Sequence, residues 1–193
     1  MFSNFFPTYD FRGPLGVSVQ ISSSTIILLL VFLSIGGSQI SILYDFVFFG
    51  LLMGSVYLHE LGHAWGCLIQ GVPVRCIKLN GIGGACERNQ SVTCYEHELI
   101  VAMGPIVNLA IWAVASLIAP YVPAGNISWT LEILAYVNLL LALFNLVPVM
   151  PLDGGKLFQL LLVRFMAPQI ATRICSRVGP VSAIICIPLI LFA

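Results

Sequence analysis

Long apolar runs dominate the chain and predict membrane-spanning helices. A spanning helix needs about 20 mostly apolar residues, and the apolar runs cover residues 19–35, 42–69, 99–119, 129–166 and 178–192. The first run ends at Gly36-Gly37, and the fourth is broken by Pro148 and Pro151 before it resumes at Gly154. We therefore expect an all-α polytopic membrane protein with about five to six transmembrane helices and core spans at about 42–70, 99–119 and 129–166.

The segment from Gly71 to Glu98 is the one sizeable polar stretch of the sequence. Its apolar and polar residues alternate loosely, and it contains Gly81, Gly83 and Gly84. Alternation with clustered glycines favours a short β-hairpin over a helix. At a membrane face such a hairpin is tolerated only where its backbone is paired or meets water.

Composition agrees with a chain that faces lipid. Hydrophobic residues make up 59% of the 193 positions and charged residues only 8%, whereas a soluble domain carries about 25% charged residues. The formal net charge is zero, so we expect no nucleic-acid partner. No linker or change in composition divides the chain, so we expect a single domain over residues 1–193.

The basic residues predict an orientation in the bilayer. Lys and Arg gather before the first apolar run, between the second and third, and between the fourth and last, at Arg12, Arg75, Lys78, Arg88, Arg164, Arg173 and Arg177. The loops around Ser38 and Gly125 contain none. By the positive-inside rule we expect a multi-pass protein whose N-terminus and Gly71–Glu98 hairpin face the cytoplasm. With five crossings the C-terminus would lie outside.

The six cysteines do not predict a disulfide framework. They stand at positions 67, 76, 86, 94, 175 and 186, and none forms a Cys-x-x-Cys pair. We interpret them as mostly small buried residues.

Three ionisable residues fall within one turn of the second apolar run. His59 and His63 are four residues apart, so on a helix both imidazoles project from one face and can share a metal ion. Zinc suits two imidazoles and a carboxylate with an open position for water, and Glu60 could take a proton from that water. The alternative is a pair of histidines that hydrogen-bond within a helix bundle. Ionisable groups are costly in hydrocarbon and favour the functional interpretation.

The third ligand must come from elsewhere in the chain. The candidates are Asp10, Asp45, Glu87, Glu96, His97, Glu98, Glu132 and Asp153. Asp153 is favoured because it lies at membrane depth in the proline-broken stretch, where unwound backbone is tolerated if it lines a cavity. Its alternative role is to cap a helix that starts at Gly154. Glu98 is the next choice as ligand.

At this point the chain resembles a known family, the site-2 proteases, which are intramembrane zinc metalloproteases. The resemblance rests on four motifs and covers nearly the whole chain. They are the zinc helix His59-Glu60-x-x-His63, the second signature Asn145-x-x-Pro148-x-x-Pro151-Leu-Asp153-Gly154, the element Gly104-Pro105-x-x-Asn108, and the hairpin Gly83-Gly84-Ala-Cys-Glu87. The first two motifs together are highly specific.

The resemblance implies a set of roles. Asp153 would be the third ligand of one Zn²⁺ per chain, and Glu60 the general base. Asn145 would hold substrate or stabilise an oxyanion, with a helix C-cap as its alternative role. Gly83, Gly84 and Ala85 would offer a strand edge to an unwound substrate.

The resemblance also implies partners and a setting. The substrates would be single-span membrane proteins, cleaved within the bilayer in regulated intramembrane proteolysis at a site that opens to the cytoplasm. We expect neither the PDZ domain nor the CBS pair that some members carry, and the sequence does not indicate an oligomeric state.

Two other functions use the same residues. The first is a metal-handling membrane protein, such as a transporter or zinc sensor, and the second is a catalytically inactive scaffold. A transport path would want further ionisable sites, whereas only Glu132 and Asp45 lie near membrane depth. Glu60 is surplus to a pure binding site, and this favours the protease.

Overall fold

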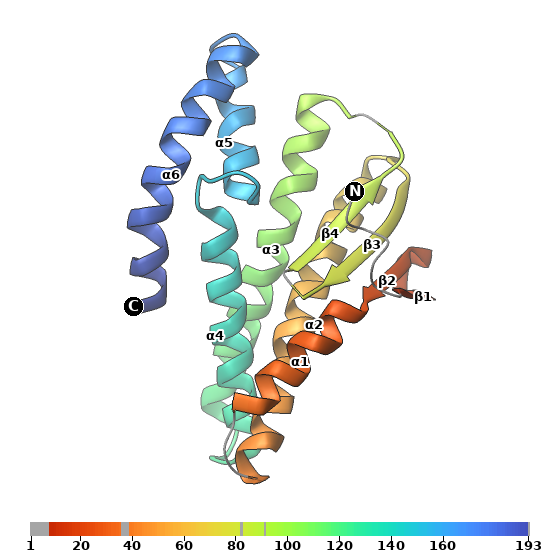
Figure 1. The fold of residues 1–193 in the computed structure, drawn as a ribbon, viewed down its shortest axis with the longest axis vertical. Helices are drawn as coiled ribbons and strands as arrows, with labels where there is room; N and C mark the ends of the chain where they lie inside the picture. The colour runs from red at the N-terminus through yellow and green to blue at the C-terminus, as the bar shows by residue number, and fades with distance from the viewer. Residues whose placement is uncertain (1–7, 36–38, 82, 91, 193) are drawn as a thin grey trace. The chain divides into compact units, whose positions relative to one another are not determined.

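The structure is a computed structural model that describes residues 8–35, 39–81, 83–90 and 92–192. The chain divides into two compact units, Met1–Ser91 and Val92–Ala193. The first unit contains two helices and a sheet, and the second is helical (Figure 1). The expected end of the first apolar run, at Gly36-Gly37, lies outside the described residues.

The helices of the first unit are α1 (Ser23–Ile35) and α2 (Gln39–Ile69). The prediction of a span over residues 19–35 was wrong at its start, because Ser18–Ser22 forms a strand. Val19 and Ile21 alternate there with polar residues, which is the period of a strand. The 13 residues of α1 reach about 20 Å at 1.5 Å per residue, which is short of the roughly 30 Å of hydrocarbon.

The sheet of the first unit has four strands in the order β1-β2-β3-β4. Their bounds are β1 Thr8–Arg12, β2 Ser18–Ser22, β3 Val74–Asn80 and β4 Gly83–Arg88. The chain turns between β1 and β2 through the short 3-10 helix η1 (Pro14–Gly16). The hairpin predicted between Gly71 and Glu98 is confirmed as β3–β4, with Lys78 opposite Ala85. The antiparallel pair β1–β2 was not predicted, and β2 joins it to β3 in parallel.

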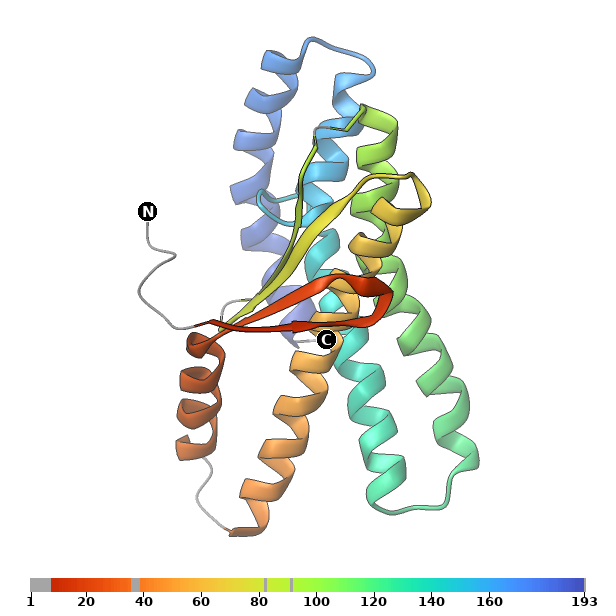
Figure 2. The ribbon, with the colours of Figure 1, turned by 90° about the vertical axis from the view of Figure 1, so that its right-hand side faces the viewer.

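The sheet packs on the second half of α2 (Figure 2). Its inner face buries Val17, Val19, Ile77 and Leu79 together with Ala64 of α2. Within the described part of the chain, β4 has a single strand neighbour, β3, and is therefore an edge of the sheet.

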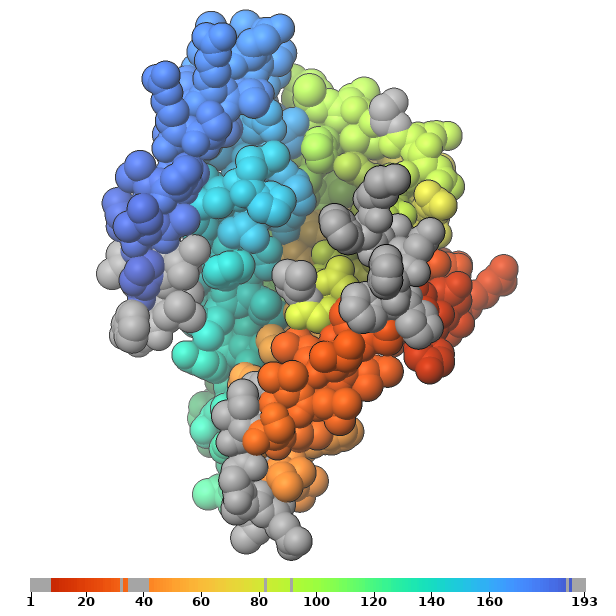
Figure 3. Space-filling view, viewed as in Figure 1, coloured from red at the N-terminus to blue at the C-terminus, as the bar shows by residue number. Residues whose placement is uncertain are grey.

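The second unit consists of helices. They are α3 (Cys94–Ile118), the 3-10 turn η2 (Ala119–Tyr121), α4 (Asn126–Leu146), α5 (Asp153–Val163) and α6 (Pro168–Phe192). α3 starts with a capping box between Thr93 and Glu96, so the Glu96 carboxylate in the first turn helps to cap this helix. α3 and α4 form a long helical hairpin (Figure 1), and the side chains of α6 lie directly against those of α4 and α5 (Figure 3).

Among the described residues, three helices are long and apolar enough to cross a membrane. They cover Ile42–Ile69, Cys94–Tyr121 and Asn126–Leu146. The first two lie at predicted core spans, whereas the third ends at Leu146 and does not reach residue 166, because the proline-broken stretch separates α4 from α5. The structure is thus mostly helical with a four-stranded sheet. α1 and α6 are not among these candidates, so five to six spans remain a prediction.

One buried polar contact joins α3 to α4. The side-chain amide of Asn108 donates to the Oδ1 atom of Asn138 at 2.7 Å, and the amide of Asn138 donates to the Leu134 carbonyl at 2.8 Å. Both asparagines are fully buried. Since unsatisfied amides are costly in an apolar bundle, this contact fixes the register of the two helices.

We expect the Asn108–Asn138 contact to stabilise the helical hairpin measurably. A double-mutant cycle with Asn108→Leu and Asn138→Leu, followed by unfolding in mixed detergent micelles, should give a coupling free energy of about 0.6–2 kcal/mol. The matched control pairs Asn108→Leu with Asn145→Leu, because the Asn145 amide donates to Leu141 of its own helix. Equal coupling in the two cycles would contradict this role.

Candidate metal centre

The pair of histidines on α2 faces inward from an otherwise apolar helix. His59 and His63 are 5% and 8% exposed, and Glu60 between them is 7% exposed. The two Nε2 atoms lie 3.1 Å apart, and the rings meet edge to face at 89°. One turn of helix separates the two residues, so the helix itself brings the two nitrogens together.

The distance between the two nitrogens suits a shared metal ion. Two nitrogen ligands of tetrahedral zinc, each with a bond of about 2.0–2.1 Å, lie about 3.3 Å apart. The observed 3.1 Å is close to this separation, so small ring rotations would admit the ion. A hydrogen bond between the two imidazoles would also fit this distance. Such a bond does not require a buried carboxylate beside the histidines, and Glu60 is such a carboxylate.

The edge strand β4 passes directly over Glu60. A Cβ atom added to Gly84 would lie 2.4 Å from Cγ and 2.7 Å from Oε1 of Glu60. Only a residue without a side chain allows the strand to come this close. Gly83, Gly84 and Ala85 thus lie on the edge strand of the described sheet, with Gly84 against the predicted general base.

Cys67 of α2 and Cys86 of β4 form a second contact between these two elements. Cys67 lies one turn beyond His63, and Cys86 lies two residues beyond Gly84 on the same face of its strand. The hydrogen bond with Cys67 and burial raise the pKa of the Cys86 thiol. Both are free cysteines. The sequence pattern predicted the two only as small buried residues, because it does not show that α2 and β4 meet at these positions.

Asp153 is the first residue of α5 in the second unit and is 3% exposed. The cap of this helix is Leu152, so the alternative role of Asp153 as a cap of a helix starting at Gly154 was wrong. The Nζ atom of Lys156 lies 3.0 Å from Oδ1 of Asp153. The sequence analysis did not single out Lys156, because an i,i+3 ion pair on an exposed helix is common.

The start of α5 is packed tightly onto the end of α4. A Cβ atom added to Gly154 would lie 2.1 Å from the Leu146 carbonyl oxygen, and one on Gly155 would lie 2.5 Å from the Val149 carbonyl. The two glycines after Asp153 thus let the helix start against the preceding loop. Asn145 lies in the last turn of α4, where its amide donates to the Leu141 carbonyl at 2.9 Å, and its predicted role toward substrate remains a prediction.

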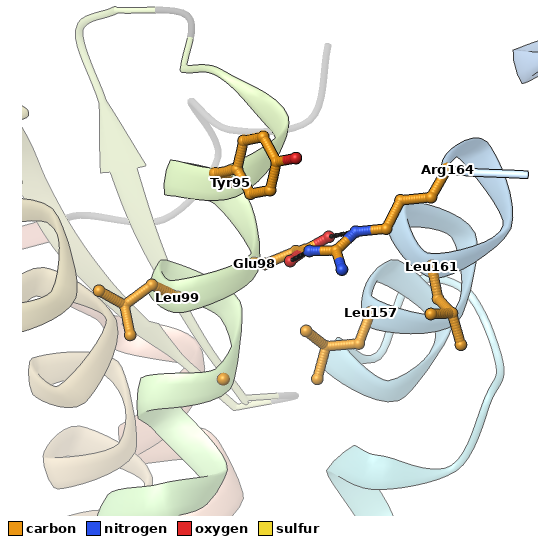
Figure 4. Close-up of a pocket in the computed structure, with 7 residues that line it drawn as sticks. Tyr95, Glu98, Leu99, Leu157, Leu161 and Arg164 are labelled. Carbon is orange, nitrogen blue, oxygen red and sulfur yellow. Dashed lines mark hydrogen bonds and ion pairs between the residues drawn. The ribbon is translucent and has the colours of Figure 1, made fainter.

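The next choice of ligand, Glu98, is engaged elsewhere. Arg164 at the end of α5 forms two hydrogen bonds to this carboxylate, one of 3.0 Å from Nε, and its guanidinium lies 5.3 Å from the centre of the Tyr95 ring (Figure 4). The pair closes one side of a cleft of about 450 Å³ that leucines of α3 and α5 line. Its residues are Tyr95, Glu98, Leu99, Ala102, Leu157, Leu161 and Arg164.

Two of the remaining candidate ligands have other partners. Glu96 caps α3, and a hydrogen bond from Lys78 lowers the pKa of Glu87 below its usual value. In the parts of the chain that the structure describes, none of the alternatives belongs to a group of three metal-ligating side chains. These alternatives are Asp10, Asp45, Glu87, Glu96, His97, Glu98 and Glu132.

Comparisons with known proteins point to one family. The sequence model of Peptidase family M50 matches residues 120–186, which include Asn145 and Asp153. The zinc metalloprotease MJ0392 of Methanocaldococcus jannaschii is 30% identical over 172 residues, or 89% of this chain and 50% of that protein. A relative in Synechocystis sp. is 35% identical over 132 residues, which are 67% of this chain and 35% of that protein.

A solved structure resembles nearly the whole chain. The site-2 protease from Methanocaldococcus jannaschii superposes with a TM-score of 0.71 at 27% identity, over 93% of this chain and 82% of that one. The chain itself spans half or less of the length of these two curated relatives. The match to MJ0392 covers 89% of the chain. Fewer residues lie outside this match than precede His59 or follow Asp153, so the match includes both residues. The chain therefore belongs to peptidase family M50, the family of the site-2 proteases.

Proposed function

We propose that this chain is a zinc-dependent endopeptidase that cleaves the transmembrane segments of other proteins within the bilayer. One zinc ion per chain would be held by His59, His63 and Asp153, with Glu60 as general base. The observation that carries this proposal is the buried His59–Glu60–His63 turn, whose carboxylate lies under the open edge of β4.

The three proposed ligands share burial and donor chemistry. Two imidazoles and one carboxylate form a common zinc-ligand set that leaves a position for water, and all three side chains are buried. Buried ionisable groups are costly unless they are paired or bind a metal. When bound, a zinc ion would polarise the scissile carbonyl and lower the pKa of a water molecule.

Glu60 would handle the protons of the reaction. Its carboxylate would accept a proton from the attacking water and later donate it to the leaving amine. Glu60 is 7% exposed, and burial of a carboxylate disfavours its charged form, which makes it a better proton acceptor. Metal binding alone does not require this residue, which favours the peptidase over a metal-handling protein or an inactive scaffold.

The edge of β4 would grip the substrate. An extended peptide can add to an exposed strand edge through backbone hydrogen bonds, and Gly83–Ala85 would bring such a peptide next to Glu60. A transmembrane helix must unwind locally for this, because its carbonyl groups are otherwise hydrogen-bonded. Asn145 is proposed to donate to the substrate carbonyl as charge develops on it.

The partners follow from the family and the apolar chain. We propose that the substrates are single-span membrane proteins processed by regulated intramembrane proteolysis. The basic residues support an orientation in which the N-terminus and the opening of the site face the cytoplasm.

Replacing the proposed base should separate metal binding from catalysis. We expect Glu60→Gln to keep one zinc per chain and to lower cleavage of single-span substrates by about 10²–10⁴-fold. His59→Ala and Asp153→Ala should lose zinc itself. Zinc content and cleavage of a substrate panel by the purified protein measure both effects, and full cleavage by a zinc-loaded Glu60→Gln protein would refute the assigned mechanism.

A methyl group at Gly84 should disturb Glu60 without touching the metal ligands. We expect Gly84→Ala to keep zinc but to lower kcat by about 10–100-fold, because small displacements of a catalytic group are costly. The matched control is Gly54→Ala on α2, where an added Cβ meets nothing within 4 Å. Equal kcat values for the two variants would show that β4 does not pack on the base.

A further inference from the structure

The ion pair at the start of α5 joins a buried carboxylate to a side chain that reaches the surface. Lys156 Nζ lies 3.0 Å from Asp153 Oδ1, and the exposed fractions of the two side chains are 36% and 4%. Gly154 and Gly155 separate them, so Lys156 is the first residue after Asp153 on this helix with a side chain beyond the backbone. Its ammonium therefore reaches back over one turn of helix.

We propose that Lys156 is a positioning residue for the metal centre, whose ammonium holds Oδ1 of Asp153 so that the carboxylate binds zinc through one oxygen in a fixed orientation. This inference rests on the proposed function, because it takes Asp153 as a zinc ligand. Residues that hydrogen-bond a ligand in this way orient it and tune the metal.

Binding through a single oxygen matters for the chemistry of the site. A carboxylate that used both oxygens would fill a further coordination position, whereas a hydrolytic zinc site needs a position open to water. The hydrogen bond from Lys156 engages one oxygen of the carboxylate. An oxygen that is held by an ammonium is a weaker donor to a metal, so the pair favours binding through one oxygen.

The backbone that carries the pair is itself held firmly. The close approach of Gly154 to Leu146 and of Gly155 to Val149 leaves no room for side chains at the start of α5. A rigid helix start keeps Asp153 and Lys156 in one relative geometry, as precise ligand placement requires.

The positive charge of Lys156 is compatible with a nearby cation. About a third of its side chain is exposed, so water can solvate the ammonium while the apolar stem covers the buried carboxylate. Screening by this water weakens the repulsion between ammonium and metal. The hydrogen bond to Oδ1 can thus persist when the metal is bound.

The test measures zinc affinity directly. We expect Lys156→Met to weaken zinc binding by about 10–100-fold in a chelator competition, and to alter the visible absorption bands of the Co²⁺-substituted protein. Lys156→Arg keeps a donor and should stay within about threefold of the wild type, because it can make the same hydrogen bond. The matched control is Arg164→Met, which removes a cation from the other end of α5 and should leave zinc affinity and the Co²⁺ spectrum unchanged.

The outcomes separate this inference from the proposed function. In one outcome, Asp153→Ala loses zinc but Lys156→Met binds zinc at least as tightly as the wild type. The ammonium would then only take the place of the metal in the metal-free protein, and the inference would be wrong. Equal losses in Lys156→Arg and Lys156→Met would also overturn it. If the wild type binds no zinc, the proposed function fails first and the inference with it.

Discussion

Ionisable side chains buried in an apolar helix are the constraint on which the rest of this structure depends. His59, Glu60 and His63 occupy one turn of α2, which is otherwise apolar enough to cross a membrane. Such groups are stable there only if each one is paired, hydrogen-bonded or bound to a metal. The two imidazoles face one another at 3.1 Å, and the side chain of Glu60 lies against β4 at Gly84.

The neighbouring elements have features that fit the burial of these ionisable groups. The strand next to Glu60 has a glycine at the point of contact, because any side chain at position 84 would overlap the carboxylate. Among the described residues, β4 has no second strand neighbour, although sheet edges are normally protected against unwanted pairing. In the second unit, two glycines allow α5 to start with a buried Asp153. The proposed peptide site beside Glu60 would account for the glycine at position 84 and for the unpaired strand edge.

Much of this could be predicted from the sequence, and the failures have physical causes. The four-residue spacing of His59 and His63 predicted a shared metal site, and the clustered glycines predicted the β3–β4 hairpin. The strand at Ser18–Ser22 was taken for part of a helix, because Val19 and Ile21 adjoin a longer apolar run. The contacts Lys156–Asp153 and Cys67–Cys86 went unpredicted, since the first resembles a common surface pair and the second joins residues far apart in the chain.

The central claim is that two imidazoles and one carboxylate hold zinc, and X-ray absorption at the zinc edge of the purified wild-type protein tests it most directly. The account predicts a first shell of nitrogen and oxygen at about 2.0–2.2 Å, with the outer-shell scattering of two imidazoles. The alternative ligands are the thiols of two free cysteines, Cys67 on α2 and Cys86 on β4. A sulfur shell at about 2.3 Å would mean that thiolates bind the metal, and would contradict the ligand set proposed for this chain.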